Sequence, residues 1–188
     1  MKFCSNCGHP ISILIPEGDN RERHCCGNCG AIHYFNPRMI VGTLPIWEDK
    51  IMICKRGIEP RAGLWTLPAG FMELGETTEE GAIRETWEET RAKVEIQHLH
   101  GIYNIPQIDQ VYFIYLAQMQ SPAYELTPES TQIELVRKED IPWDDIAFAV
   151  IKKALQDYIE GSPTPHNTVH HKDLLVPRLG ERIKPKLY

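Results

Sequence analysis

The chain has 188 residues, of which 42% are hydrophobic, and this is enough for one globular domain with a small appendage. It carries 26 acidic and 20 basic residues, for a formal net charge of -6. An acidic chain is a poor general nucleic-acid binder, because phosphate backbones are held mainly by clustered lysine and arginine. No apolar run approaches the roughly 18 residues expected of a membrane span. We therefore expect neither nucleic acid nor a membrane as a partner.

Two pairs of cysteines, each separated by two residues, stand near the start of the chain. They are Cys4 with Cys7 and Cys26 with Cys29, and 18 residues lie between the pairs. This spacing is typical of two knuckles that hold one tetrahedral Zn²⁺ through four thiolates. Disulfides of an exported protein are the alternative, but they require an apolar export signal, and the three residues before Cys4 leave no room for one. We therefore expect structural zinc and a cytoplasmic protein.

The segment between the two cysteine pairs has the pattern of a β-hairpin. Residues 11–15 and 21–24 flank the turn-forming sequence Pro-Glu-Gly-Asp-Asn. Cys25 and Cys54 remain as free thiols. Only Cys26 has the two-residue gap to Cys29, so Cys25 is a competitor for the metal rather than the expected ligand. Cys54 is expected to be buried, because it lies in an apolar run.

The chain from about residue 37 to residue 161 predicts a mixed sheet with two helices, an α/β fold. Runs rich in branched and aromatic residues predict strands at 39–47, 50–56, 64–67, 94–103, 110–119 and 132–137. Pro45 predicts an edge or a bulge in the first of these strands. Asp144 and Asp145 are expected to cap a second helix, whose apolar positions follow the helical period as far as Gly161.

The last 25 or so residues contain four prolines and predict a loosely held tail. His166, His170 and His171 lie in this tail. We expect them to be exposed rather than to bind a metal.

The excess negative charge of the chain lies in one short stretch. Residues 73–89 contain seven glutamates and one arginine, a formal charge of -6, so the other 171 residues balance to zero. Thr77 and Glu80 have capping-box spacing, which predicts a helix from about Thr78 to Thr90. Like charges three and four apart destabilise such a helix by roughly 0.2 to 0.5 kcal/mol each. A bound divalent cation would reverse this effect.

Three of these glutamates share one helix face. Glu85, Glu88 and Glu89 stand at positions i, i+3 and i+4. Carboxylates are hard oxygen ligands, which favour Mg²⁺ or Mn²⁺ over zinc and leave open positions for a substrate phosphate. On charge alone, a solvated acidic helix face is the alternative.

The sequence around this helix decides between the two interpretations. The pattern Gly70-x5-Glu76-x7-Arg84-Glu85-x2-Glu88-Glu89 resembles the signature of the Nudix hydrolases, with six fixed positions at correct offsets over 20 residues. Three positions depart from that signature: Thr86 and Ala92 replace larger aliphatic residues, and Arg91 replaces a glycine. None of these positions carries a metal ligand in the family.

The resemblance implies a Nudix alpha/beta/alpha sandwich and a division of the chain into a zinc ribbon at 1–34, a Nudix domain at 35–161 and a tail at 162–188. A closer similarity is to the plant chloroplast FAD and ADP-ribose pyrophosphatases and their bacterial relatives. It is carried by residues 15–19, 54–56, 63–70, 128–130 and 141–142. It implies a substrate with an ADP half, a small-molecule dinucleotide or nucleoside diphosphate sugar, and a homodimer. NADH pyrophosphatases also join a zinc ribbon to a Nudix domain, but residues 104–110 lack their Ser-Gln-Pro-Trp-Pro-Phe-Pro segment.

The family resemblance also implies roles for individual residues. It places the catalytic Mg²⁺ or Mn²⁺ on the Gly70 carbonyl and on Glu85, Glu88 and Glu89, with a glutamate such as Glu85 accepting a proton from water. Arg84 is expected to orient the carboxylates by pairing with them. Glu129 is a further candidate for metal or base work, because some relatives use a glutamate outside the signature.

Candidates for substrate binding follow from side-chain chemistry. An aromatic ring such as Phe71, Tyr103 or Phe148 can stack on adenine, although each ring is also a candidate for core packing. Lys55 or Arg56 can contact a phosphate. Three functions remain open: an FAD or ADP-ribose pyrophosphatase, a pyrophosphatase of NADH or NAD-capped RNA, and a binding module on a catalytically silent Nudix domain.

Overall fold

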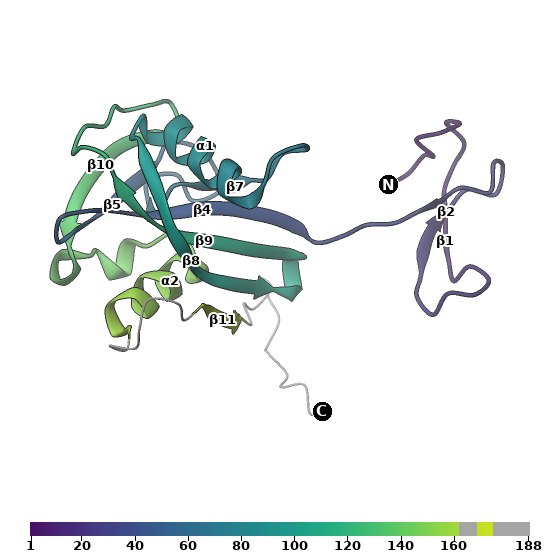
Figure 1. The fold of residues 1–188 in the computed structure, drawn as a ribbon. Helices are drawn as coiled ribbons and strands as arrows, with labels where there is room; N and C mark the ends of the chain where they lie inside the picture. The colour runs from purple at the N-terminus through teal and green to yellow at the C-terminus, as the bar shows by residue number, and fades with distance from the viewer. Residues whose placement is uncertain (162–168, 175–188) are drawn as a thin grey trace. The chain divides into compact units, whose positions relative to one another are not determined.

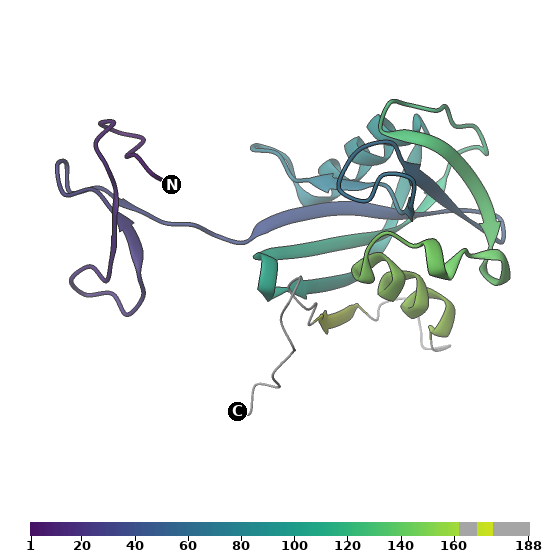
Figure 2. The same ribbon diagram turned by 180° about the vertical axis from the view of Figure 1, so that it is seen from behind.

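The structure is a computed structural model that describes residues 1–161 and 169–174. The chain forms two compact units, Met1–Pro37 and Arg38–Tyr188 (Figures 1 and 2). The boundary between them lies three residues after the one expected from the sequence.

The first unit contains a small antiparallel sheet. Its strands are β1 (Ser12–Leu14), β2 (Arg23–Cys25) and β3 (Ile32–His33), in the order β1-β2-β3. The expected hairpin is confirmed by the pairing of β1 with β2. Asp19 organises the turn, since its carboxylate accepts from the Asn20 N–H at 2.7 Å and from Arg23 Nε at 2.8 Å.

The second unit is built on a mixed sheet. Its strands are β4 (Arg38–Trp47), β5 (Lys50–Arg56), β6 (Trp65–Thr66), β7 (Ala69–Phe71), β8 (Val94–Ile105), β9 (Gln110–Met119), β10 (Ser130–Arg137) and β11 (His170–Asp173). The main path is β10-β5-β4-β9-β8-β11, while β6 pairs with β5 and β7 pairs with β4. The β4–β9 and β8–β11 pairs are parallel and the other pairs are antiparallel.

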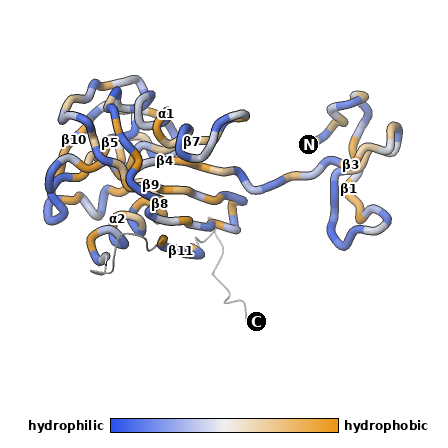
Figure 3. The backbone as a smooth tube through the Cα atoms, in the orientation of Figure 1, coloured by the Kyte–Doolittle hydropathy of each residue, from blue (hydrophilic) through white to orange (hydrophobic). Residues whose placement is uncertain are grey.

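Helices α1 (Thr78–Thr90) and α2 (Ala149–Glu160) cover opposite faces of this sheet (Figures 1 and 2). Side chains alternate between the two faces of a strand. In β4, Val41 therefore packs with Ala82 of α1, whereas Leu44 packs in the cluster that contains Val150 of α2. Hydrophobic segments recur along β4, β9 and α2 (Figure 3). The predicted α/β/α sandwich with a mixed sheet is confirmed.

Pro45 lies in β4, which is inside the sheet rather than at its edge. The N–H of Thr43 donates to the Pro68 carbonyl, on the side of β4 away from β9. Alternation places the nitrogen of Pro45 on that same side. There β4 pairs with β7 at Ile40–Gly42 and with β5 only from Ile46 onward. The proline therefore occupies a local gap in the ladder, where no N–H donor is required.

The start of α2 differs from the prediction. Asp144 and Asp145 belong to a 3-10 turn, η3 (Trp143–Asp145), and do not cap the helix. Ile146 is extended and forms a bridge to Trp65, so the helix begins only at Ala149, after an N-cap residue, Phe148, that makes no side-chain cap. The helix ends before Gly161, as expected.

The expected tail contains a strand that the sequence did not predict. Residues 170–173 form β11, which pairs in parallel with β8 from Gly101 to Asn104. His171 is exposed, as expected, and His170 is half-buried. His166 lies outside the described residues. Two further 3-10 turns are η1 (Pro106–Ile108) and η2 (Lys138–Asp140). No helix in the described part of the chain is long and apolar enough to cross a membrane.

Candidate active site and metal centres

Helix α1 begins at a capping box, as the sequence predicts. The hydroxyl of Thr77 accepts from the Glu80 N–H at 3.2 Å, and the Glu80 carboxylate accepts from the Thr77 N–H at 2.8 Å. These bonds satisfy donors that the first turn of a helix leaves free. They define the first turn of α1, and the candidate carboxylates follow along the same helix.

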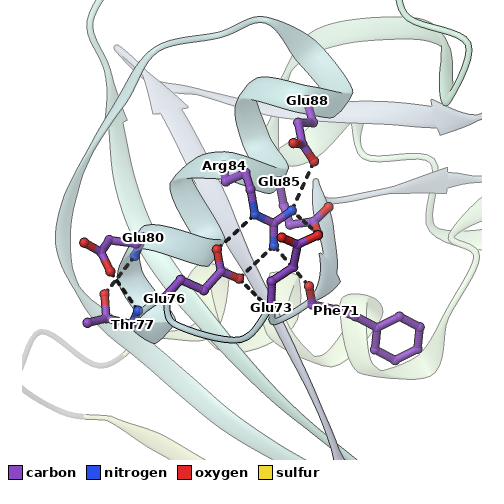
Figure 4. A network of polar contacts seen from close by, with 8 residues as sticks. All are labelled: Phe71, Glu73, Glu76, Thr77, Glu80, Arg84, Glu85 and Glu88. Carbon is purple, nitrogen blue, oxygen red and sulfur yellow. Dashed lines mark hydrogen bonds and ion pairs between the residues drawn. The ribbon is translucent and has the colours of Figure 1, made fainter.

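Arg84 is the centre of the acidic stretch (Figure 4). Its guanidinium donates to both carboxylate oxygens of Glu76 at 2.8 and 3.0 Å, to Glu85 at 2.8 Å, to Glu88 at 3.0 Å and to the Phe71 carbonyl at 3.1 Å. These five bonds match the five N–H donors that an arginine has. In this arrangement Arg84 orients carboxylates and has no N–H left for a substrate. Its hydrogen bonds lower the pKa of Glu76 to about 2.

Glu89 lies on the same helix but points into the protein, where only 7% of the residue is exposed. Its Oε2 accepts a weak hydrogen bond from the Cys54 thiol at 3.7 Å. Burial, with the nearby charges of Glu85 and Glu129, raises the pKa of Glu89 to about 8. Burial also raises the pKa of Glu85. A dication would offset the negative charge that these side chains concentrate.

The carboxylate oxygens of the three proposed metal ligands, Glu85, Glu88 and Glu89, do not converge on one point in this structure. In residues 1–161 and 169–174, only the four cysteines bring three or more potential ligand atoms within 4.8 Å of one another. Glu85 and Glu88 share Arg84, whereas Glu89 turns toward Cys54. The atoms that these residues offer to a metal are nonetheless all oxygens. The buried carboxylate of Glu89 has no ion pair among the described residues. This chemistry fits Mg²⁺ or Mn²⁺.

Two glycines let this site form. A Cβ on Gly70 would collide with the carboxylate of Glu85, so glycine allows that side chain to lie directly over the β7 backbone. A Cβ on Gly81 would lie 2.6 Å from Glu76 Oε1 and 2.8 Å from Val41 Cγ2. Glycine there allows α1 to pack closely on β4 while Glu76 reaches Arg84.

The three departures from the Nudix signature have structural explanations. Thr86 is fully buried and its hydroxyl pairs with that of Thr43 at 2.6 Å, while also donating to the Ala82 carbonyl at 2.7 Å. Ala92 is buried in a hydrophobic cluster with Ala117 and Met119 of β9. Arg91 ends the helix in the left-handed conformation, with φ of 56°, although it is not a glycine.

The four cysteines of the first unit form a compact group. The Sγ atoms of Cys4 and Cys29 are 3.7 Å apart and those of Cys7 and Cys26 are 3.5 Å apart. Tetrahedral zinc with Zn–S bonds of about 2.3 Å separates its sulfurs by roughly 3.8 Å, whereas a disulfide would require about 2.05 Å. The cysteines therefore fit one Zn²⁺. Cys25 is outside the group, as predicted.

The candidates for substrate binding fall into two groups. Most of them take part in cation–π pairs, whereas Tyr103 is buried in the core. Phe71 is half exposed, and its ring points away from Arg84 (Figure 4) and lies 5.3 Å from the Arg38 guanidinium. The Arg56 guanidinium lies 5.1 Å from the Phe148 ring and also donates to the Pro60 carbonyl. Lys55 lies over Trp65.

The proposal that Tyr103 stacks on adenine is wrong. Its side chain is fully buried in the core, and its hydroxyl donates to Asp157 at 3.2 Å. The ring lies on the α2 face of the sheet, which α1 and its carboxylates do not contact.

Several contacts of the candidate site residues were not predicted from the sequence. His33 Nε2 lies 3.3 Å from Cys4 Sγ, and Cys54 contacts Glu89. Arg38 reaches Phe71 from the start of β4. No short-range pattern marks these residues, because each contact joins residues that are far apart in the sequence.

Comparison with known proteins gives the family. Residues 36–158 match the family model described as the NUDIX domain, and residues 2–35 match the one described as Nudix N-terminal, a zinc ribbon. The chain therefore belongs to the Nudix hydrolase family, and the resemblance carried by Gly70, Glu76 and Arg84–Glu89 is confirmed.

Individual relatives show how far the similarity extends. An NAD-capped RNA hydrolase NudC of Chromobacterium violaceum is 28% identical over 171 residues, which cover 90% of this chain and 56% of that protein. An ADP-ribose pyrophosphatase of Methanocaldococcus jannaschii is 38% identical over 76 residues, 40% of this chain and 45% of that protein. The chain thus spans only about half the length of the curated relatives it matches.

A solved structure matches more completely. A Nudix hydrolase from Nitrosomonas europaea superposes with a TM-score of 0.87 at 45% identity, covering 93% of this chain and all of that one. This likeness extends over both units of the chain.

Proposed function

We propose that this protein is a Mg²⁺- or Mn²⁺-dependent pyrophosphatase that cuts a nucleoside diphosphate-linked substrate with an ADP half, FAD or ADP-ribose, and releases AMP. The observation that carries the proposal is the arrangement of α1. Arg84 holds Glu85 and Glu88 in place, and Glu89 is a buried carboxylate beside them. If the acidic face of α1 were only a solvated surface, Glu89 would lie in water rather than in the protein.

The residues at this site would divide the chemistry as follows. Bound Mg²⁺ or Mn²⁺ would neutralise the diphosphate oxygens and activate a water molecule. Glu85, Glu88, Glu89 and the Gly70 carbonyl would hold the ions. Glu85, whose pKa is raised by burial, would accept the proton of the attacking water, with Glu129 as the second candidate for this role. Arg84 would keep the carboxylates oriented throughout.

Two arginine–aromatic pairs support a substrate with a planar base. Arg56 with Phe148 and Arg38 with Phe71 each place a guanidinium near a ring. Neither Arg38 nor Arg56 has a carboxylate partner in the described part of the chain. A guanidinium without an ion pair can meet a phosphate, and an exposed ring such as Phe71 can stack on a base.

A second candidate is a pyrophosphatase of NADH or NAD-capped RNA. The similarity to the NudC of Chromobacterium violaceum favours it. Against it stands the sequence at the end of β8 and in the turn after it, where Asn104, η1 and Asp109 stand in place of the Ser-Gln-Pro-Trp-Pro-Phe-Pro segment. The preserved carboxylates argue against a catalytically silent module. A homodimer in the cytoplasm stays a prediction.

The direct test is to offer FAD, ADP-ribose and NADH in parallel, with Mg²⁺ or Mn²⁺, and to measure AMP by chromatography. We expect at least one of the first two substrates to release AMP, and to release it faster than NADH does. Faster release of AMP from NADH would favour the second candidate. No AMP from any substrate would contradict the hydrolase assignment.

A matched pair of variants tests the site itself. Glu88→Gln removes a proposed metal ligand and should lower kcat by at least about a hundredfold, since charge stabilisation at such sites supplies several kcal/mol. Glu79→Gln changes an exposed glutamate in the first turn of the same helix and should leave kcat unchanged. Equal activity of the two variants would remove the carboxylate site from the mechanism.

A further inference from the structure

The loop between β9 and β10 returns to the carboxyl end of α1. The Glu125 N–H donates to the Thr90 carbonyl at 2.8 Å. Two residues later, the Thr127 hydroxyl donates to the Glu89 carbonyl at 3.0 Å. The loop is thus fastened to the part of α1 that carries the proposed metal ligands.

Thr127 also organises the turn that follows it. Its hydroxyl accepts from the N–H groups of Glu129 at 3.3 Å and Ser130 at 3.1 Å. The backbones of Thr127 and Ser130 exchange two further hydrogen bonds, at 3.1 and 3.2 Å. A single side-chain oxygen therefore connects Glu89 to the backbone of Glu129, and a hydroxyl is the group that can donate and accept at once.

Glu129 is held from the opposite side by β5 and the residue after it. The Gly57 N–H donates to the Glu129 carbonyl at 2.8 Å. A Cβ on Gly57 would collide with the Pro128 carbonyl oxygen and would lie 3.1 Å from Thr131 Cγ2. The absence of a side chain at Gly57 allows the turn to sit directly against the strand end.

The side chain of Glu129 is left available by these contacts. Its backbone is fixed on both sides, whereas its carboxylate is exposed and makes no hydrogen bond or ion pair within the described residues. This carboxylate therefore stands on a turn that the Thr127 hydroxyl ties directly to the Glu89 carbonyl at the end of α1.

We propose that Thr127 is a positioning residue for the reaction: its hydroxyl ties the Glu129 turn to the Glu89 backbone so that the Glu129 carboxylate faces the metal-binding carboxylates of α1. The inference rests on the proposed pyrophosphatase function. Glu129 would act on the reacting water, and Thr127 would act only through Glu129. Thr127 itself touches no substrate.

The test compares Thr127→Val, Thr127→Ser, Glu129→Gln and the double variant Thr127→Val/Glu129→Gln in the full chain. Thr127→Val keeps the shape of the side chain but loses the hydroxyl. It should lower kcat for AMP release about 10- to 100-fold, because small displacements of a reacting group cost rates of this order. KM, and the Mn²⁺ affinity measured by electron paramagnetic resonance, should change less than about twofold. Thr127→Ser restores the hydroxyl and should restore kcat.

The double variant distinguishes positioning from simple loop stability. If Thr127 acts through Glu129, Thr127→Val should have no further effect on kcat in the Glu129→Gln background. Multiplicative losses, or a Thr127→Val enzyme as fast as the parent, would overturn the inference. If Thr127→Val does not fold, Gly57→Ala carries the test, since its Cβ displaces the same turn and should lower kcat without changing KM; an unchanged kcat there would also overturn it. A parent protein that releases no AMP would instead contradict the proposed function.

Discussion

The two proposed metal centres of this protein are prepared to different degrees. In the zinc ribbon, four sulfurs lie at 3.5 to 3.7 Å in pairs, close to the spacing that zinc requires. In the Nudix domain, Arg84 holds two of the three carboxylates, and the third is buried beside Cys54. The ribbon has almost no core of its own, whereas the Nudix domain packs both faces of its sheet.

The two units obtain their stability from different sources. A unit of 37 residues is too small for a sufficient hydrophobic core, so we expect metal binding to supply its folding free energy. The Nudix domain contains its own counter-ion, Arg84, which permits the acidic helix to fold before a dication arrives. We therefore propose a structural role for the metal of the first unit and a role in the reaction for the metal of the second.

Removal of zinc should produce the largest effect. Structural zinc contributes roughly 10 to 16 kcal/mol in comparable small units. Cys26→Ser should therefore abolish zinc binding and collapse the amide signals of residues 1–37 in NMR spectra, while those of the Nudix domain remain. Cys25→Ser, the matched control, should keep both. Folded protein with a zinc content near zero would contradict the comparison.

Acidic pH should lower the free energy of unfolding of the Nudix domain through His100. This residue is 4% exposed and its Nε2–H donates to the Ala154 carbonyl at 3.0 Å, and burial lowers its pKa to about 4. In the unfolded chain the imidazole of His100 binds a proton near pH 6.5, whereas in the folded protein it does so only near pH 4. The contribution of neutral His100 to the free energy of unfolding is therefore fully present above pH 6.5 and is lost as the pH falls to 4. The loss should reach up to about 3 kcal/mol.

His100→Gln is the control for this effect, because the amide can donate to Ala154 without titrating. Urea unfolding at several pH values measures the slope. The parent should lose up to about 1.4 kcal/mol per pH unit in this window from His100, and the variant should lack that component. Identical slopes would show that His100 does not contribute.

The hydroxyl pair beneath α1 offers a smaller test. Thr86→Val alone leaves the buried Thr43 hydroxyl without its partner and should lower the free energy of unfolding by about 1 to 3 kcal/mol. The double variant Thr43→Val/Thr86→Val removes both hydroxyls and should recover most of the loss. An additive loss in the double variant would show that the pair is not coupled.

Arg91 should give the smallest change and the opposite sign. Its φ of 56° costs a side-chain-bearing residue about 1 kcal/mol, which glycine avoids. Arg91→Gly should raise the unfolding free energy by up to about that amount, reduced by the lost contact with Trp87. Arg91→Ala keeps the strain, loses the contact, and should be less stable than both.

Local signals predicted the parts of the fold that depend on neighbouring residues. The bounds of α1, β5 and β9 agree with the sequence analysis, because a capping box and runs of branched residues act over a few positions. The Nudix signature identified the family for the same reason. The start of α2 was missed because Ile146 is held extended by its bridge to Trp65, a contact 81 residues away in the sequence.

Long-range contacts account for the other errors. The sequence of β11, His-His-Lys-Asp, has no strand pattern, and the strand forms by pairing with β8 and by the bonds of Asn104 to His171 and Asp173. Tyr103 was placed at the site by its chemistry, but the alternation of β8 turns it into the core. Glu89 was expected among converging ligands, and its burial beside Cys54 depends on the packing of α1 against the sheet.

The central claim is that Glu85, Glu88 and Glu89 bind a hard dication at the diphosphate of a substrate. Crystals soaked in Mn²⁺ with AMP, measured at the manganese absorption edge, test it most directly. We expect an anomalous difference peak between these three carboxylates, with Glu89 turned toward it. Data of the same quality that show no manganese there, with all three side chains as they are without it, would contradict the claim.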